Sequence, residues 1–245
     1  MSDLIVRDLS VHYGGIRAVR GVNLEARKGQ VVAIVGPNGA GKSSTARAIM
    51  GLEPATGAVS ISGREVLGHP TSMRASLGVG FVPEGRGVFG PLSVRENLLL
   101  GGYCIDSKLH TKRLDVICEL FPVLGRRFEQ HASSLSGGEQ QMLAVGRALM
   151  SDPAVLICDE PSMGLAPAVS KTLFATLRTI ADRGAAVLLG DQNAGRVFAV
   201  ADEVCVMRLG SIIARGTPRS LGSPDELASH YFGTDSGSSA GLADT

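Results

Sequence analysis

Residues 31–43, "VVAIVGPNGAGKS", decide the fold of this chain. An apolar run of strand length is followed by the pattern GxxxxGK[ST], from Gly36 to Ser43, and then by a helical pattern over residues 42–50. Glycines allow successive backbone N–H groups to turn inward around phosphates, and the start of the following helix adds favourable partial charge. Because the motif lies between a strand and a helix, it predicts a phosphate-binding loop in an α/β protein.

The residue types in this loop, residues 36–43, predict a nucleoside triphosphate as the ligand. Lys42 would neutralise the β and γ phosphates, and the Ser43 hydroxyl would be a ligand of Mg²⁺. ATP and Mg²⁺ are therefore the expected cofactors. The residues predicted to bind ATP are Gly36, Pro37, Asn38, Gly39, Ala40, Gly41, Lys42, Ser43 and Ser44.

A second motif, "VLICDEP" at residues 155–161, is an apolar strand that ends in two acids. Alone it is equally typical of a strand followed by a charged turn. Beside a phosphate loop it predicts Asp159 as a holder of Mg²⁺ and Glu160 as the general base that polarises the attacking water.

The remaining pattern predicts alternating strands and helices. Short apolar runs at residues 31–35, 78–82, 154–158 and 185–189 are typical of buried parallel strands, and helical patterns cover residues 94–100, 111–121, 139–150 and 169–183. The first sixty or so residues instead alternate polar and apolar positions between glycine turns, which predicts an antiparallel β layer flanking the nucleotide site. We expect one domain over residues 1–234, with a helical subdomain at about 91–150 inserted between two core strands, and a disordered tail at 235–245.

Composition excludes several classes of protein. With 245 residues and 44% hydrophobic content the chain can bury one substantial core, and a formal net charge of +1 offers no field to hold a nucleic acid. The four cysteines form no CxxC pair, so neither a zinc site nor a disulfide framework is indicated. The opening lacks the features of a secretion signal, and no apolar run approaches the roughly 18 residues that span a bilayer. A cytoplasmic chain is expected, with any membrane role supplied by a partner.

A third motif, "LSGGEQQ" at residues 135–141, is named here the signature turn. A Ser-Gly-Gly turn ahead of a helix exposes backbone donors and predicts a second anion site. A glycine turn that only caps an amphipathic helix would explain "SGG" alone equally well. Ser136 precedes Asp159 by 23 residues, which leaves open whether both serve the same phosphate.

The three motifs in this order resemble the ATP-binding cassette (ABC) family over about residues 4–233. The resemblance implies a P-loop NTPase of ABC type, α/β, with a mostly parallel core sheet, an N-terminal antiparallel β layer and an inserted helical subdomain. It also implies that two cassettes close head to tail, so that ATP joins them and hydrolysis releases them. Tyr13 matches the family's adenine-stacking aromatic. The signature residues implied to contact ATP held by the opposite cassette are Ser136, Gly137, Gly138 and Glu139.

Three positions depart from the family pattern. Glu84, in "PEGR", replaces the usual glutamine of the Q-loop; Ala166, in "MGLA", replaces the D-loop aspartate; and Gln192, in "DQNA", stands at the position of the switch histidine. None of the five histidines lies near residues 185–189. One interpretation is a decayed site that binds ATP but hydrolyses it poorly.

The interpretation we favour is a branch of the family. "PEGR", "GLAP" and "DQNA" together resemble the LivF type, the second ATPase subunit of branched-chain amino-acid importers. Glu84 could still face Mg²⁺ or a water as an oxygen ligand, and Gln192 could still donate to a γ phosphate, so both are candidate catalytic residues with Glu160. Gly190 and Asp191 depart from the branch's usual "VEQNA", with no effect that the sequence specifies.

The LivF-type resemblance implies a set of partners. They are a second, unlike cassette, two membrane-spanning permease subunits and, indirectly, an extracytoplasmic solute-binding protein, which places the chain peripherally on the cytoplasmic side of the membrane. A homodimer in isolation is compatible with this assembly. Residues 84–97 would form much of the groove for a permease helix, with Phe89 and Leu92 either in that groove or packed inside.

Three other functions compete with this one. An importer ATPase for urea, short amides or another small polar solute would carry the same motifs. A cassette acting on nucleic acid is disfavoured by near-neutral charge and by the lack of a heptad run. A small-molecule P-loop kinase would leave the signature turn without a role.

Overall fold

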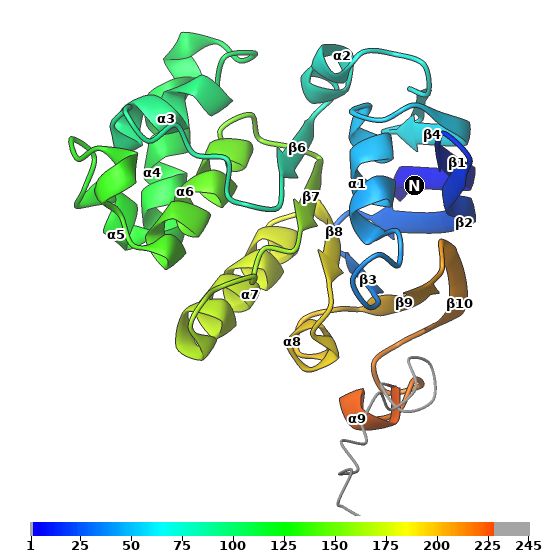
Figure 1. Ribbon diagram of the computed structural model, residues 1–245. Helices are drawn as coiled ribbons and strands as arrows, with labels where there is room; N and C mark the ends of the chain where they lie inside the picture. The colour runs from blue at the N-terminus through cyan, green and yellow to red at the C-terminus, as the bar shows by residue number, and fades with distance from the viewer. Residues whose placement is uncertain (1, 228–245) are drawn as a thin grey trace, which may run out of the picture.

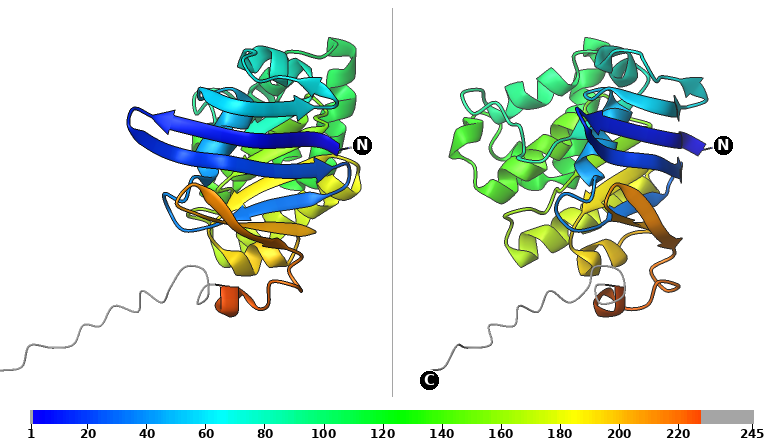
Figure 2. Two further views of the ribbon diagram at one scale, coloured as in Figure 1. Left: turned by 90° about the vertical axis from the view of Figure 1, so that its right-hand side faces the viewer. Right: turned by 45° about the vertical axis from the view of Figure 1, so that its right-hand side comes forward.

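The computed structural model describes residues 2–227, so the predicted tail at 235–245 and residues 228–234 of the predicted domain lie outside the described residues. The chain begins with an antiparallel sheet of order β2-β1-β4-β5, which confirms the predicted N-terminal layer. Its two long strands run side by side across the molecule (Figure 2). The strands are β1 (Ser2–Tyr13), β2 (Ile16–Arg27), β4 (Ala55–Ile61) and β5 (Arg64–Glu65).

A second sheet forms the centre of the molecule (Figure 1). Its order is β10-β9-β3-β8-β7-β6, and every neighbouring pair is parallel except the edge pair β9–β10. The four predicted strands are confirmed, so the α/β class with a mostly parallel sheet is correct. The strands are β3 (Val31–Val35), β6 (Val79–Val82), β7 (Val155–Asp159), β8 (Ala186–Asp191), β9 (Glu203–Arg208) and β10 (Ser211–Gly216).

The hairpin of β9 and β10 was not among the predicted strands. Its two-residue connection, Leu209 and Gly210, has φ of 48° and 85°. A two-residue turn with positive φ at both residues has a backbone twist that matches the twist of the two strands it joins. Leucine rarely takes this conformation, so the turn carries a weaker sequence signal than Asn-Gly would.

The central strands are apolar throughout because both faces of their sheet are covered. On β3, Val31 and Val35 belong to a core shared with the helices, whereas Val32 and Ile34 belong to a core shared with the antiparallel sheet. Helix α1 (Lys42–Met50) packs in the second core, between the two sheets. This double burial explains continuous apolar runs in place of alternation.

The predicted helical subdomain lies between β6 and β7 in the chain and to one side of the sheet (Figure 1). Its last helix, α6, begins at Gly137, two residues before the predicted start, because Ser136 caps it. Among residues 2–227 no helix is both long and apolar enough to cross a bilayer. The subdomain consists of α3 (Val94–Gly101), η1 (Ser107–Leu109), α4 (His110–Leu120), α5 (Pro122–Gly125), η2 (Ala132–Ser134) and α6 (Gly137–Leu149); the other helices are α2 (Thr71–Ser76), α7 (Pro167–Asp182), α8 (Ala194–Phe198) and α9 (Pro224–Leu227).

The parallel strands end at one common edge. Val35 pairs in register with Asp191, Asp159 with Gly190, and Val82 with Cys158. The loops that follow β3, β6, β7 and β8 therefore meet at the carboxyl edge of the sheet, where open α/β sheets bind their ligands.

Arg74 on α2 holds the end of α1, the helix that follows the phosphate loop. Its buried guanidinium donates to the carbonyl oxygens of Ala48 (2.8 Å), Ile49 (2.6 Å) and His69 (3.2 Å). Replacing Arg74 with methionine removes these three hydrogen bonds, although the Ala48 carbonyl still accepts from the Gly51 N–H (3.1 Å). We expect a loss of about 2 kcal/mol in the free energy of unfolding. Urea unfolding measures the loss. The matched control is R64M, an exposed arginine on β5; equal losses in both variants would contradict a capping role for Arg74.

Candidate functional site

The phosphate loop requires glycine at two positions for steric reasons. A Cβ on Gly36 would lie 2.3 Å from the carbonyl oxygen of Met207, and one on Gly41 would lie 2.6 Å from that of Ala18. Gly41 also has φ of 110°, which side chains other than glycine rarely adopt. The loop is thus fitted between β2 and β9, and the Gly210 N–H donates to the Ala40 carbonyl (2.8 Å) from the neighbouring hairpin.

Lys42 and Glu160 form a buried ion pair at the end of this loop. The Lys42 Nζ lies 2.9 Å from Glu160 Oε1, and the two side chains are 4% and 8% exposed. The ammonium also donates to the carbonyls of Gly36 (2.8 Å) and Pro37 (3.1 Å). Glu160 has a left-handed backbone, with φ of 47°, and its N–H donates to the Gly190 carbonyl (2.8 Å). Such strain is typical of residues that the fold holds for function.

Ser43 and Asp159 meet beside this pair. The Ser43 hydroxyl donates to Asp159 Oδ1 (2.9 Å), while Asp159 Oδ2 is buried without a hydrogen-bond partner. Burial raises the pKa of the Asp159 carboxyl, the Ser43 hydrogen bond partly offsets this, and the charge of Glu84 adds to the rise. Burial likewise raises the pKa of Glu160, against the lowering effect of Lys42. Two buried carboxyls with one orphaned oxygen suit a divalent cation.

A cavity of about 320 Å³ lies between the phosphate loop, Glu84 and Glu160. Tyr13, at the end of β1, stands beside the loop with its hydroxyl 3.4 Å from Ser44 Oγ. The structure therefore brings together the predicted residues of the phosphate loop, both acids that follow β7, Tyr13 and Glu84. The cavity is lined by Ala18, Asn38, Gly39, Gly41, Lys42, Ser43, Ser44, Glu84, Glu160 and Met163.

The signature turn does not line this cavity. Ser136 is exposed and caps α6: its Oγ accepts from the Glu139 N–H (3.4 Å), and Glu139 Oε2 accepts from the Ser136 N–H (2.8 Å). Glu139 also pairs with Arg127 (3.3 Å). The reciprocal hydrogen bonds form a capping box, so the alternative of a helix cap is realised locally. Ser136, Gly137 and Gly138 remain outside the cavity formed by the phosphate loop of the same chain.

The loops that depart from the family pattern lie at the same edge of the sheet. Gln192 is exposed directly after β8, and Ala166 is the residue before α7, which starts with Pro167. A Cβ on Gly190 would lie 3.5 Å from Asp159 Oδ1, which is ordinary contact. The structure thus gives no steric reason for the glycine at position 190.

Three residues that the sequence did not single out as site residues tie these loops together. Buried Asp191 accepts from Ser162 Oγ (2.7 Å) and from the Asn193 N–H (2.8 Å). Arg196 on α8 donates to the same Ser162 hydroxyl (2.8 Å). This network joins the loop after Glu160 to the loop that carries Gln192. The only sequence signal was an acid at a strand end with Asn193 at a helix cap.

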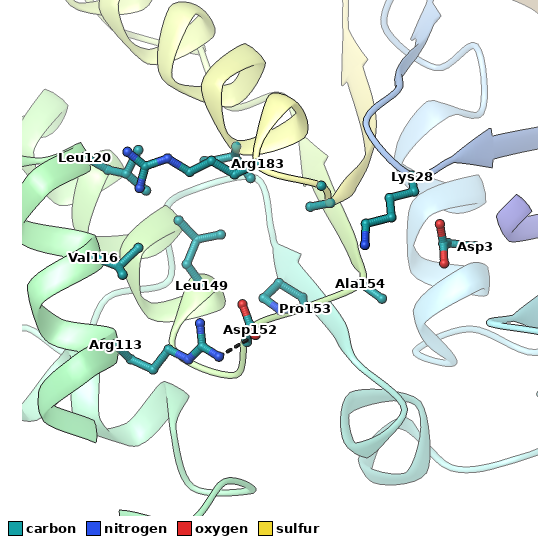
Figure 3. A pocket seen from close by; sticks show the side chains of 13 residues that line it. Asp3, Lys28, Arg113, Val116, Leu120, Leu149, Asp152, Pro153, Ala154 and Arg183 are labelled. Atoms are coloured by element: carbon teal, nitrogen blue, oxygen red, sulfur yellow. Dashed lines mark hydrogen bonds and ion pairs between the residues drawn. The ribbon is translucent and has the colours of Figure 1, made fainter. Parts of the chain in front are cut away.

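A second cavity, of about 290 Å³, lies at the opposite end of the parallel strands (Figure 3). Ala154 and Ala185, which precede β7 and β8, line it, and Arg113 of α4 pairs there with Asp152. Because it lies at the amino ends of the strands, it is separate from the phosphate loop and contains none of the predicted site residues.

Comparison with known proteins places these features in a family. The family model for ABC transporters matches residues 19–163. The high-affinity branched-chain amino acid transport ATP-binding protein BraG of Pseudomonas aeruginosa is 42% identical over 228 residues, covering 92% of this chain and 97% of that protein. The probable branched-chain amino acid transport ATP-binding protein LivF of Archaeoglobus fulgidus is 33% identical, covering 87% and 91%.

A solved structure gives the same result for the fold. The nucleotide-free ATP-binding cassette of an ABC transporter superposes with a TM-score of 0.82 at 25% identity, covering 93% of this chain and 98% of that one. With the phosphate loop, the paired acids and the capped signature turn in place, the chain belongs to the ABC transporter family and is one of its ATPases.

Proposed function

We propose that this chain is the ATP-hydrolysing subunit of an importer for branched-chain or related amino acids, bound peripherally to the cytoplasmic side of the membrane. The observation that carries the ATPase is the meeting of two pairs at one edge of the sheet. Lys42 Nζ lies 2.9 Å from Glu160 Oε1, and Ser43 Oγ lies 2.9 Å from Asp159 Oδ1. The likeness to BraG over nearly the whole length of both chains supports the choice of cargo.

In this proposal each predicted site residue in or beside the cavity has a separate task. Lys42 holds the β and γ phosphates of ATP, and Tyr13 stacks on the adenine. Ser43 Oγ and the orphaned Asp159 Oδ2 hold Mg²⁺, with Glu84 facing it from the next loop. A bound Mg²⁺ would supply positive charge to neutralise the charge that develops on the phosphates. Glu160 orients and polarises the attacking water, and Gln192 donates to the γ phosphate. Among residues 2–227, no group of three or more His, Cys, Asp or Glu side chains is arranged so that it could hold a metal ion by itself.

Two cassettes are needed to complete each site. Ser136 is exposed, Gly137, Gly138 and Glu139 are half-buried, and none of the four lines the phosphate-loop cavity of its own chain. These residues would serve ATP held by a second, unlike cassette. The Gly137 and Gly138 N–H groups at the start of α6 would supply the donors for this anion, because the Ser136 and Glu139 N–H groups are used in the capping box. In isolation the chain would form at most a homodimer of the same geometry.

An apolar groove between the core and the helical subdomain is the proposed docking site for a permease subunit. Here it is called the docking groove, and its lining includes Phe89, Leu100 and Tyr103, which are 51%, 45% and 87% exposed. Leu92 is not part of this lining, so of the two predicted apolar contacts only Phe89 lies in the groove. Exposed apolar side chains gathered in a concave surface favour a protein partner.

Replacing Tyr103 with aspartate is expected to reduce co-purification of the permease subunits about tenfold or more, because a charge in this groove must be desolvated on docking. Quantitative mass spectrometry of the purified complex measures the loss. I213D, on the half-exposed edge strand β10, introduces the same charge outside the groove and should leave the complex intact. Equal losses for both variants would remove the groove from its assigned role.

Purification of the chain with its native complex tests the proposed function. The expected partners are a different cassette and two membrane-spanning subunits, with ATP hydrolysis stimulated by the loaded solute-binding protein. The ligand of that binding protein decides the cargo: leucine, isoleucine or valine supports the proposal, whereas urea or a short amide would replace it by the competing importer. Recovery of nucleic acid or ribosomes in place of membrane subunits would refute transport altogether.

A further inference from the structure

The loop after β6, residues 83–90, contacts helix α6 both near the start and near the end of that helix. Here it is called the Glu84 loop. At the end of α6, Arg147 donates to the Gly87 carbonyl (2.7 Å) and its guanidinium carbon lies 5.0 Å from the centre of the Phe89 ring. At the start of α6, Arg86 donates to Gln140 Oε1 (3.1 Å). The loop that carries Glu84 is therefore tied directly to the helix that begins with the signature turn.

The backbone of the Glu84 loop is held in an uncommon conformation at the second tie. Gly85, Arg86 and Gly87 have φ of 82°, 69° and 58° in succession. Glycine takes these values without strain, but arginine does not. Other contacts must therefore hold Arg86 in this conformation, and its side chain makes them.

The Arg86 guanidinium fills the space in front of the signature turn. A Cβ on Gly137 would lie 2.7 Å from Arg86 Nη2 and 3.0 Å from its Nη1, so a side chain at this position would displace the guanidinium from its present place. Gln140, which accepts the Arg86 hydrogen bond, also donates to the Ala132 carbonyl (3.1 Å). Arg86 and Gln140 together bridge the Glu84 loop, the start of α6 and the segment before the signature turn.

Charge does not explain this placement. Within residues 2–227 no carboxylate pairs with Arg86, and its neighbour is the start of a helix, where the backbone is itself partly positive. The arginine is thus held by shape and by one hydrogen bond from its guanidinium to an uncharged amide oxygen, an arrangement suited to fixing the distance between two loops.

We propose that Arg86 is a positioning residue that fixes the signature turn to the Glu84 loop. Contact of Glu84 with nucleotide in this chain's own cavity then sets Ser136 and Gly138 for the nucleotide of the opposing cassette. The inference rests on the proposed function, and it assigns to "PEGR" a role that neither Glu84 nor the docking groove provides: a direct link from one nucleotide site to the other.

Hydrogen exchange at the Glu139 and Gln140 amides of the full-length chain tests the link itself. R86M and Q140L should each raise these exchange rates roughly threefold or more, and the double variant should raise them no further, because both changes break the same link. R64M, on β5, is the matched control. Unchanged exchange in R86M, or additive effects in the double variant, would overturn the proposal.

ATP turnover tests the consequence of the link. R86M and R86G should lower kcat about tenfold with the equilibrium affinity for Mg·ATP unchanged, since Arg86 lines the neighbouring cavity with Gln140 and Glu160 but not the phosphate-loop cavity. R86G relieves the strained backbone, so a fall in kcat without a fall in melting temperature cannot be ascribed to misfolding. A kcat equal to that of the unaltered chain, or an equal loss of affinity, would overturn the positioning role. Absence of turnover in the unaltered chain assembled with its partner cassette would refute the proposed function, while the exchange measurement would still decide the link.

Discussion

Replacing Glu160 with glutamine is expected to reduce steady-state ATP hydrolysis by about a thousandfold while ATP remains bound. Glutamine keeps the size of the side chain but cannot accept a proton from the attacking water. Lys42, Ser43 and Asp159 are unchanged, so the affinity for Mg·ATP should persist. Release of phosphate from the purified chain measures turnover, and equilibrium dialysis with labelled ATP measures binding.

The same variant should accumulate as an ATP-dependent dimer, because closed cassettes separate only after hydrolysis. Sedimentation with and without Mg·ATP detects the change in mass. E129Q, an exposed glutamate of the helical subdomain, makes the same chemical change away from the cavity and should behave as the unaltered chain. Turnover in E160Q within a few fold of the control would remove Glu160 from its role as general base.

Replacing Lys42 with methionine should lower the affinity for ATP at least about a hundredfold, or about 2.7 kcal/mol. The variant lacks the cation that meets the β and γ phosphates. It also leaves Glu160 as a buried carboxylate without its partner, so we expect a loss of about 3 kcal/mol in the free energy of unfolding of the nucleotide-free chain. Urea unfolding without nucleotide measures the stability, and calorimetry measures the binding.

A double variant separates these two effects. K42M combined with E160Q removes the unpaired carboxylate, so stability should return most of the way to that of the unaltered chain, while ATP affinity stays low. If stability does not recover, the Lys42–Glu160 pair is not what K42M disrupts. If affinity recovers, Lys42 does not hold phosphate.

The sequence predicted the centre of the fold because local and long-range signals agree there. The run "VVAIV" is apolar at every position since both faces of β3 are covered, and Gly36 and Gly41 follow it for steric reasons that the structure makes explicit. The hairpin of β9 and β10 was not predicted because its turn requires a positive φ at Leu209, and leucine is not a residue type from which a positive φ is expected. Turn chemistry that depends on an uncommon leucine conformation cannot be recognised from composition.

The site was predictable only as far as its motifs extend. The motifs named Lys42, Ser43, Asp159 and Glu160, but the pairing of Lys42 with Glu160 joins segments far apart in the chain and follows from strand order. Asp191, Ser162 and Arg196 form a network in which each residue type is common, so no spacing signals it. The position of the Arg86 guanidinium depends on the absence of a side chain at Gly137. The sequence alone does not indicate which other residue lies close to a given glycine.

The buried pair of Lys42 and Glu160 also sets the order of events in a working cycle. One ammonium cannot hold its own chain's base and an incoming phosphate in the same geometry, so the resting subunit keeps its base engaged. In the proposed ATPase, we expect arrival of the triphosphate to draw Lys42 away and to leave Glu160 available to water. The proposed general base would therefore be freed from its ion pair only when ATP binds.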